Sequence, residues 1–88
     1  MIAKNYTITS EQGIHARPAT VIVGALTNFK SEVKIEYKGK QANLKSIMGV
    51  MALGVPNGAT ITITADGEDE AQVIEKMDEV MKNEGLAQ

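Results

Sequence analysis

Residues 13–29, GIHARPATVIVGALTNF, hold the change of pattern that organises this chain. Before them, apolar residues alternate as in a strand with one buried face. From Ala16 onward the apolar spacing becomes helical. The residues at that spacing are Ala19, Ile22, Val23, Leu26 and Phe29. Pro18 fits the first turn of a helix, where its missing N–H costs little. We therefore predict a helix from about Ala16 to Asn28, preceded by a break at Gly13.

Outward from this segment, the periodicity predicts four strands and two further helices. The strands lie near residues 2–8, 33–38, 41–44 and 59–65, where apolar and polar residues alternate. A short helix is predicted from Ile47 to Ala52, and a last helix between the acidic residues 68–70 and Gly85. The order β-α-β-β-α-β-α indicates the α+β class, with a sheet covered by helices on one face and exposed on the other.

The composition argues against disulfide-bonded, thiolate-metal and membrane-spanning proteins. The chain has 88 residues and no cysteine. We expect a single domain over residues 1–88, without disulfides or thiolate metal sites. The N-terminal residues lack the apolar core of a signal peptide, and the longest apolar stretch, Ile47 to Leu53, is too short to span a bilayer. We expect a cytoplasmic protein that does not insert into membranes and is a monomer.

Charge is unevenly distributed along the chain. Residues 1–46 hold seven basic and three acidic residues, whereas residues 47–88 hold two basic and eight acidic ones. A basic half can steer acidic partners toward itself. No basic cluster with interleaved aromatic residues is present, so we do not expect a nucleic-acid partner.

His15 is the only histidine, and it lies at the start of the predicted helix. A helix N-terminus presents unpaired N–H groups and partial positive charge, which together hold an anion such as phosphate. The guanidinium of Arg17 can bind phosphate oxygens in a forked geometry. These residues favour a histidine that accepts a phosphoryl group.

Other interpretations of His15 remain open from the residues alone. It could be a helix cap or an exposed side chain without function. A metal site is disfavoured, because one histidine without cysteine cannot supply three or four ligands. A serine–histidine–aspartate triad lacks a recognisable nucleophile motif. An enzyme with a small anion pocket is also weakly supported, because one histidine and one arginine lack a partner base or metal.

Two segments carry a resemblance to a known family. Residues 13–19, GIHARPA, resemble the active-site segment of HPr, the histidine-containing phosphocarrier protein of the sugar phosphotransferase system. Residues 43–51, NLKSIMGVM, resemble the regulatory segment of HPr from low-GC Gram-positive bacteria. The similarity covers essentially the whole chain. It implies an open-faced β-sandwich, a four-stranded antiparallel sheet with its helices on one face.

The resemblance implies a role for each residue of the first segment. His15 would receive a phosphoryl group on Nδ1 from phosphorylated enzyme I, itself charged by phosphoenolpyruvate, and pass it to the IIA domain of a sugar transporter. Arg17 would stabilise that group, together with the backbone amides of Ala16 and Arg17. The protein would be a stoichiometric carrier rather than an enzyme, and it would need no cofactor or metal.

Ser46 has two compatible interpretations. Its position before the short helix is typical of an N-cap. The resemblance implies in addition that HPr kinase/phosphorylase phosphorylates Ser46 with ATP. The modified protein would then act with catabolite control protein A in carbon catabolite repression. A phosphate at the N-terminus of a helix is accommodated without unfolding.

The apolar residues of the short helix suggest a docking surface. Usually a Met-rich stripe on a helix is core. This helix is too short to bury all of Ile47, Met48 and Met51, so we predict that they form an adaptable patch for several partners.

Two further readings lie within the family. Purely regulatory HPr paralogues lack the active-site histidine, which His15 argues against. A branch related to nitrogen metabolism serves other partners, and the segment around Ser46 resembles the sugar branch more. Gly24 and Thr27 stand where enteric HPr proteins carry lysines, which leaves docking more dependent on apolar contacts.

Overall fold

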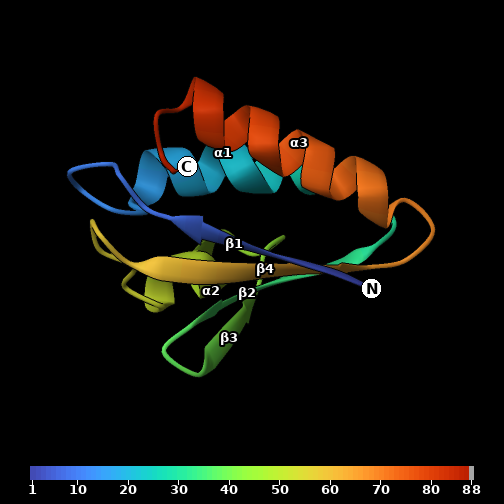
Figure 1. The fold of residues 1–88 in the computed structure, drawn as a ribbon, viewed down its shortest axis with the longest axis horizontal. Helices are drawn as coiled ribbons and strands as arrows, with labels where there is room; N and C mark the ends of the chain where they lie inside the picture. The colour runs from blue at the N-terminus through green and yellow to red at the C-terminus, as the bar shows by residue number, and fades with distance from the viewer. Residues whose placement is uncertain (88) are drawn as a thin grey trace.

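The computed structural model describes residues 1–87, and its seven elements follow the predicted order (Figure 1). They are β1 (Ile2–Thr7), α1 (Ala16–Leu26), β2 (Glu32–Tyr37), β3 (Lys40–Asn43), α2 (Ile47–Ala52), β4 (Thr60–Asp66) and α3 (Glu70–Asn83). Helix α1 ends two residues before the predicted Asn28. There the N–H of Phe29 bonds to the Leu26 carbonyl at 3.1 Å, which turns the chain toward β2. Within residues 1–87 no helix is long and apolar enough to cross a membrane.

The four strands form one antiparallel sheet in the order β1-β4-β2-β3. The last strand in the sequence, β4, lies inside the sheet, with Ile61 opposite Tyr6 of β1 and Ile63 opposite Ile35 of β2. Strands β2 and β3 form a hairpin in which Tyr37 pairs with Lys40. Because β4 separates β1 from β2, these two strands are joined in the sheet only through a strand that comes late in the sequence. Alternation within each strand carries no information about this order.

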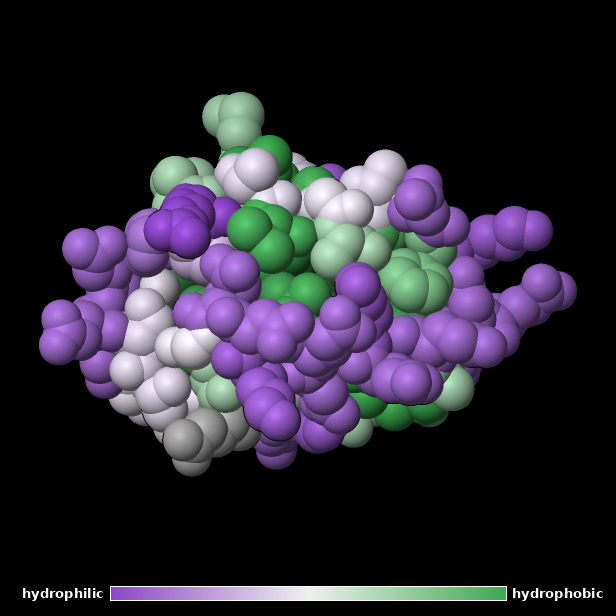
Figure 2. All heavy atoms as spheres, turned by 90° about the horizontal axis from the view of Figure 1, so that it is seen from above, coloured by the Kyte–Doolittle hydropathy of each residue, from purple (hydrophilic) through white to green (hydrophobic). Residues whose placement is uncertain are grey.

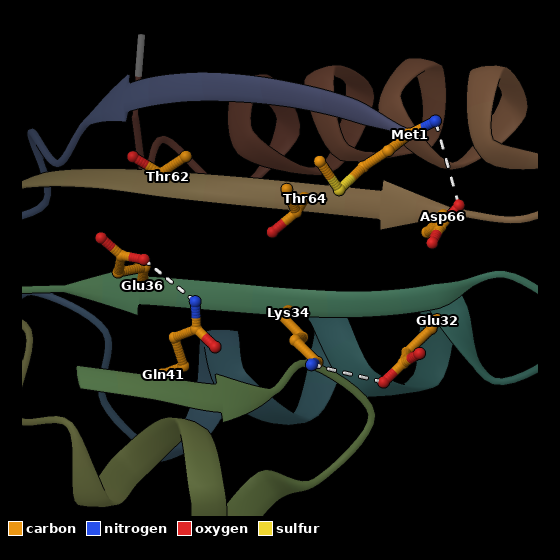
Figure 3. Close-up of a pocket in the computed structure, with 8 residues that line it drawn as sticks. All are labelled: Met1, Glu32, Lys34, Glu36, Gln41, Thr62, Thr64 and Asp66. Carbon is orange, nitrogen blue, oxygen red and sulfur yellow. Dashed lines mark hydrogen bonds and ion pairs between the residues drawn. The ribbon is translucent and has the colours of Figure 1, made fainter. Parts of the chain in front are cut away.

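The helices cover one face of the sheet, as the α+β prediction requires. Figure 3 looks onto the other face, which carries polar side chains such as Lys34, Thr62 and Thr64, and α1 and α3 lie behind the sheet. The core between the two layers is built from branched aliphatic and methionine side chains. Its fully buried members include Ile22, Leu26, Ile35, Ile61, Ile63 and Met77. Burial of this apolar face is the main term that holds the layers together.

Lys4 is a charged residue at a position of β1 where the alternation of the strand predicts a buried apolar side chain. Its contacts explain why a lysine is tolerated there. Its ammonium group lies 2.6 Å from a carboxylate oxygen of Asp78 on α3. The hydroxyl of Tyr6 donates to the same oxygen at 2.6 Å. Burial, and then the bond to Asp78, raise the pKa of the Tyr6 hydroxyl. The lysine therefore lies at the margin of the core, where it ties β1 to α3.

Candidate functional site

His15 is the N-cap residue of α1, and its side chain caps nothing. Its backbone is extended, with φ −101° and ψ −168°. Its carbonyl accepts from the N–H of Ala19 at 3.1 Å, but the imidazole makes no capping hydrogen bond. The simple interpretation of His15 as a side-chain helix cap is therefore wrong. The half-buried ring is left at the mouth of the helix with its nitrogens available.

The first turn of α1 offers two backbone donors beside this ring. Pro18 has no N–H, and Ala19 already donates to the His15 carbonyl. The amides of Ala16 and Arg17 precede the helical ladder and have no acceptor among the described residues. Both residues are exposed. The structure thus brings together the predicted backbone donors, the Arg17 side chain and His15 at the positive end of a helix dipole.

The loop before His15 is held rigidly against the segment that precedes β4. The N–H of Ile14 donates to the Val55 carbonyl at 3.0 Å, and the Ile14 side chain is buried. Gly13 has φ +66°, and a Cβ on it would lie 2.1 Å from the Val55 carbonyl oxygen. Only glycine permits this approach. The first strand already ends at Thr7, and the role of Gly13 is to fix the path of the chain into His15.

The chain after α3 completes the surroundings of His15. The N–H groups of Thr9 and Ser10 both donate to the Leu86 carbonyl, at 2.8 and 3.3 Å. This brings the end of α3 beside the loop that precedes His15. One depression of about 200 Å³ is lined by Ser10, His15, Arg17, Pro18, Asn83, Glu84 and Leu86. The ion pairs of the described residues do not include one between Arg17 and Glu84.

Sequence reasoning missed four residues that line this depression, which are Ser10, Asn83, Glu84 and Leu86. They lie far from His15 in the sequence or outside its motif. The turn at Gly85, with φ +61°, is the one signal that the chain folds back there. The sequence does not say what that return segment meets.

Ser46 is the N-cap of α2, as predicted. Its hydroxyl oxygen accepts from the N–H of Gly49 at 3.1 Å, and its carbonyl accepts from the N–H of Val50 at 3.0 Å. A Cβ on Gly49 would lie 3.3 Å from the Ser46 hydroxyl oxygen. Glycine at position 49 therefore keeps space around the hydroxyl, a role that sequence reasoning missed.

An apolar surface lies on α1 and α2. The fractional exposure of Met48 is 83%, that of Met51 is 43% and that of Ile47 is 38%. Val21 on α1 is 36% exposed, whereas Val50 of α2 is fully buried. These four exposed residues, Val21, Ile47, Met48 and Met51, are called the apolar patch below. The prediction that α2 cannot bury its whole apolar set is confirmed. Seen from above, the molecule is mostly hydrophilic, with hydrophobic side chains gathered from the top to the centre of the view and a smaller group at its lower right margin (Figure 2).

Among residues 1–87 no group of three histidine, cysteine, aspartate or glutamate side chains is arranged to hold a metal ion. A separate depression lies on the open face of the sheet, and its lining includes Lys34 and the three carboxylates of Glu32, Glu36 and Asp66 (Figure 3). It shares no residue with the His15 site.

Comparison with known proteins identifies the family. A family model described as the phosphorylation site of the HPr component of the phosphotransferase system matches residues 2–83. The chain belongs to the HPr family. HPr proteins are phosphocarriers, so this chain is a member of a phosphocarrier family.

Solved HPr structures resemble the whole molecule. The mycoplasma histidine-containing phosphocarrier protein is 41% identical, with 99% of each chain covered and a TM-score of 0.96. HPr from Bacillus anthracis is 35% identical, with 90% of this chain and 94% of that chain covered and a TM-score of 0.83. These likenesses confirm the resemblance to Gram-positive HPr and the open-faced sheet.

A catabolite-repression relative is also similar. Crh, the Bacillus subtilis catabolite repression containing protein, is 38% identical, with 96% of this chain and 97% of that chain covered and a TM-score of 0.74. Crh was solved as a domain-swapped dimer. A protein of this architecture has therefore been observed as a dimer, and the monomeric state expected for this chain stays a prediction.

Proposed function

We propose that this chain carries a phosphoryl group on His15 between phosphorylated enzyme I and the IIA domains of sugar transporters. One observation supports this most strongly: an uncapped imidazole, two unpaired amides and a guanidinium lie together at the start of α1. An anion formed on the ring meets donors that are already in place, so little reorganisation accompanies transfer.

In the proposed reaction the protein is both acceptor and donor. A lone pair on Nδ1 of His15 attacks phosphorus while the bond between phosphorus and enzyme I breaks. The new P–N bond then breaks as a IIA domain takes the group, and the imidazole is regenerated. Arg17 and the amides of Ala16 and Arg17 hold the phosphoryl oxygens in both steps. Binding must remain moderate, because a phosphorylated state held too tightly would not transfer.

We infer that no cofactor is needed, since the phosphoryl group derives from phosphoenolpyruvate through enzyme I. The protein is consumed and regenerated as a co-substrate. Its own contribution is a nucleophile and an anion site on a rigid loop, held by Gly13 and Val55. The partners supply the remaining catalytic groups.

We further propose that Ser46 is a regulatory site, phosphorylated by HPr kinase/phosphorylase. The cap geometry supports this, because a phosphate on Ser46 would lie at the N-terminus of α2 without breaking the fold. It would also place negative charge beside the apolar patch. The modified protein would pair with catabolite control protein A, a role favoured by the likeness to Crh.

The apolar patch is the proposed docking surface for these partners. Met48 and Met51 offer flexible side chains that adapt to unrelated surfaces. We propose that the chain acts as a monomer, which leaves the patch and the His15 site open to each partner in turn. Size-exclusion chromatography with light scattering tests this state, and a dimer at working concentration would contradict it.

Incubation with phosphoenolpyruvate, magnesium and enzyme I, followed by intact-mass spectrometry, tests the transfer role. We expect one added phosphoryl group that is acid-labile, stable in base and absent from His15→Ala. An Arg17→Ala variant should be labelled slowly. If an enzyme I that labels another HPr adds no mass to this chain, the carrier role is rejected, and a purely regulatory protein controlled at Ser46 becomes the better account.

A further inference from the structure

Methionine provides all the sulfur in this chain. The sequence contains five methionines, no cysteine and no tryptophan. Two-electron oxidants such as peroxides therefore meet no thiol that would react first. The thioethers are the side chains most open to such chemistry, and their exposure decides which of them reacts.

Exposure divides the methionines sharply. Met77 and Met81 lie on the buried side of α3, and their exposed fractions are 0% and 2%. Met48 and Met51 project from α2 within the apolar patch, at 83% and 43%. Met1 is 79% exposed and lies on the open face of the sheet, beside Asp66 and away from α2 (Figure 3). Two reactive thioethers thus lie on the proposed docking surface, and a third lies elsewhere.

We propose that Met48 and Met51 are sites of reversible oxidation by peroxides, and that their sulfoxides weaken docking of phosphotransferase partners. The inference rests on the proposed docking role of the apolar patch. In the reaction a sulfur lone pair attacks one peroxide oxygen and the O–O bond breaks. The sulfur gains that oxygen, and the peroxide leaves as water or an alcohol. Sulfur loses two electrons, which the peroxide gains.

Because Met48 and Met51 lie on the surface, their oxidation should affect the binding of partners and not the fold. A sulfoxide is polar and chiral, so a patch that bound by apolar contact would lose complementarity. The fold should survive, because the core side of α2 is provided by Val50, which is fully buried. The cap at Ser46 is also untouched, since its acceptor bond runs to the Gly49 amide. Oxidation therefore acts on recognition, leaving His15 and Arg17 intact.

The experiment treats the full chain with hydrogen peroxide, removes the oxidant and maps the sulfoxides by peptide mass spectrometry. Phosphoryl transfer from enzyme I is then measured against protein concentration. A double variant, Met48→Leu with Met51→Leu, is treated in the same way. It keeps Met1 as an oxidisable site, and each protein is compared with its own untreated sample. Far-UV circular dichroism monitors the fold.

We expect Met1, Met48 and Met51 to oxidise before Met77 and Met81. The KM for the oxidised chain should rise by about fivefold or more, the scale of losing an important interface contact. The double variant should show no such rise, and methionine sulfoxide reductases with a dithiol should restore the original KM. An unchanged KM with both patch sulfoxides present would overturn the inference, as would an equal rise in the double variant. If the untreated chain takes no phosphoryl group, the carrier role itself fails, which is a separate result.

Discussion

The carboxylate of Asp69 holds Ser31, joining the turn before α3 to the start of β2. It accepts from the Ser31 amide at 2.9 Å and from the Ser31 hydroxyl, and a second oxygen accepts from the Lys30 amide at 2.8 Å. Ser31 is 1% exposed, the one buried polar residue among the described residues. Gly67 packs against it so closely that a Cβ there would lie 2.6 Å from the hydroxyl oxygen. This contact joins two loops that are distant in sequence.

Stability should depend on the charge of Asp69. The Ser31 hydroxyl, followed by the Lys30 amide, lowers the pKa of this carboxyl from 3.8 to about 2. Because the folded-state pKa lies below the unfolded one, the contribution is fully present above pH 4 and is lost as the pH falls toward 2. Urea midpoints measured across this range should fall for the wild type. Asp69→Asn should have a lower midpoint at pH 7 and a flatter pH dependence. Equal slopes for the two proteins would contradict this assignment.

Replacing Gly24 or Gly13 by alanine should change the free energy of unfolding in opposite directions. Gly24 lies in the exposed middle of α1 with open space around it, so Gly24→Ala should raise the free energy of unfolding by about 0.5–1 kcal/mol. Gly13→Ala meets the Val55 carbonyl and a positive φ, and should lower it by about 2 kcal/mol or more. The Gly13 variant should also take phosphoryl groups more slowly, because the loop into His15 moves. Urea denaturation measures the change in stability of both variants. Labelling by enzyme I measures the slower phosphoryl transfer expected for the Gly13 variant.

The hairpin turn contains a strained lysine. Lys38 has φ +51° and precedes Gly39 with φ +78°, the geometry that favours asparagine followed by glycine. Lys38→Asn should therefore stabilise the fold by about 0.5–1 kcal/mol, because asparagine tolerates this conformation better. Lys40→Asn, which removes the same charge from β3, is the matched control. Thermal unfolding should show a higher Tm for Lys38→Asn than for Lys40→Asn. An equal change of Tm in the two variants would mean that the effect comes from the lost charge and not from the backbone conformation.

Ser46 should reveal its two roles through two variants. Ser46→Ala removes the acceptor for the Gly49 amide and should lower the free energy of unfolding by about 1 kcal/mol. It should also abolish ATP-dependent labelling by HPr kinase/phosphorylase. Ser46→Asp keeps a capping oxygen without a hydroxyl, so stability should be retained while labelling is lost. Label remaining on either variant would place the phosphate on another residue.

Docking should depend on apolar contact at α2. Met48→Asp should raise the KM for transfer from enzyme I about tenfold, because a charge enters the apolar patch. Its unfolding midpoint should barely change, since Met48 is 83% exposed. Gln72→Asp adds the same charge on the exposed side of α3 and should leave the KM unaltered. Similar kinetics for the two variants would mean that partners dock elsewhere.

Local chemistry allowed much of this protein to be predicted from its residues. Apolar periodicity indicated the type of each element because side chains on a helix or strand repeat with fixed spacing. The Ser46 cap and the break at Gly13 were predictable for the same reason, since each acts within a few residues. The resemblance of residues 13–19 and 43–51 to HPr indicated the family, and the family match and solved structures confirmed it.

Long-range contacts were decided only by the tertiary structure. The position of β4 between β1 and β2 depends on which faces pack together, and alternation within a strand is the same for every order. Glu84 reaches the His15 depression because Leu86 bonds to the chain after β1. Asp69 and Ser31 meet because two loops close over one end of the core. Each of these contacts joins residues far apart in sequence, and their geometry exists only once the apolar faces of the sheet and helices have been buried together.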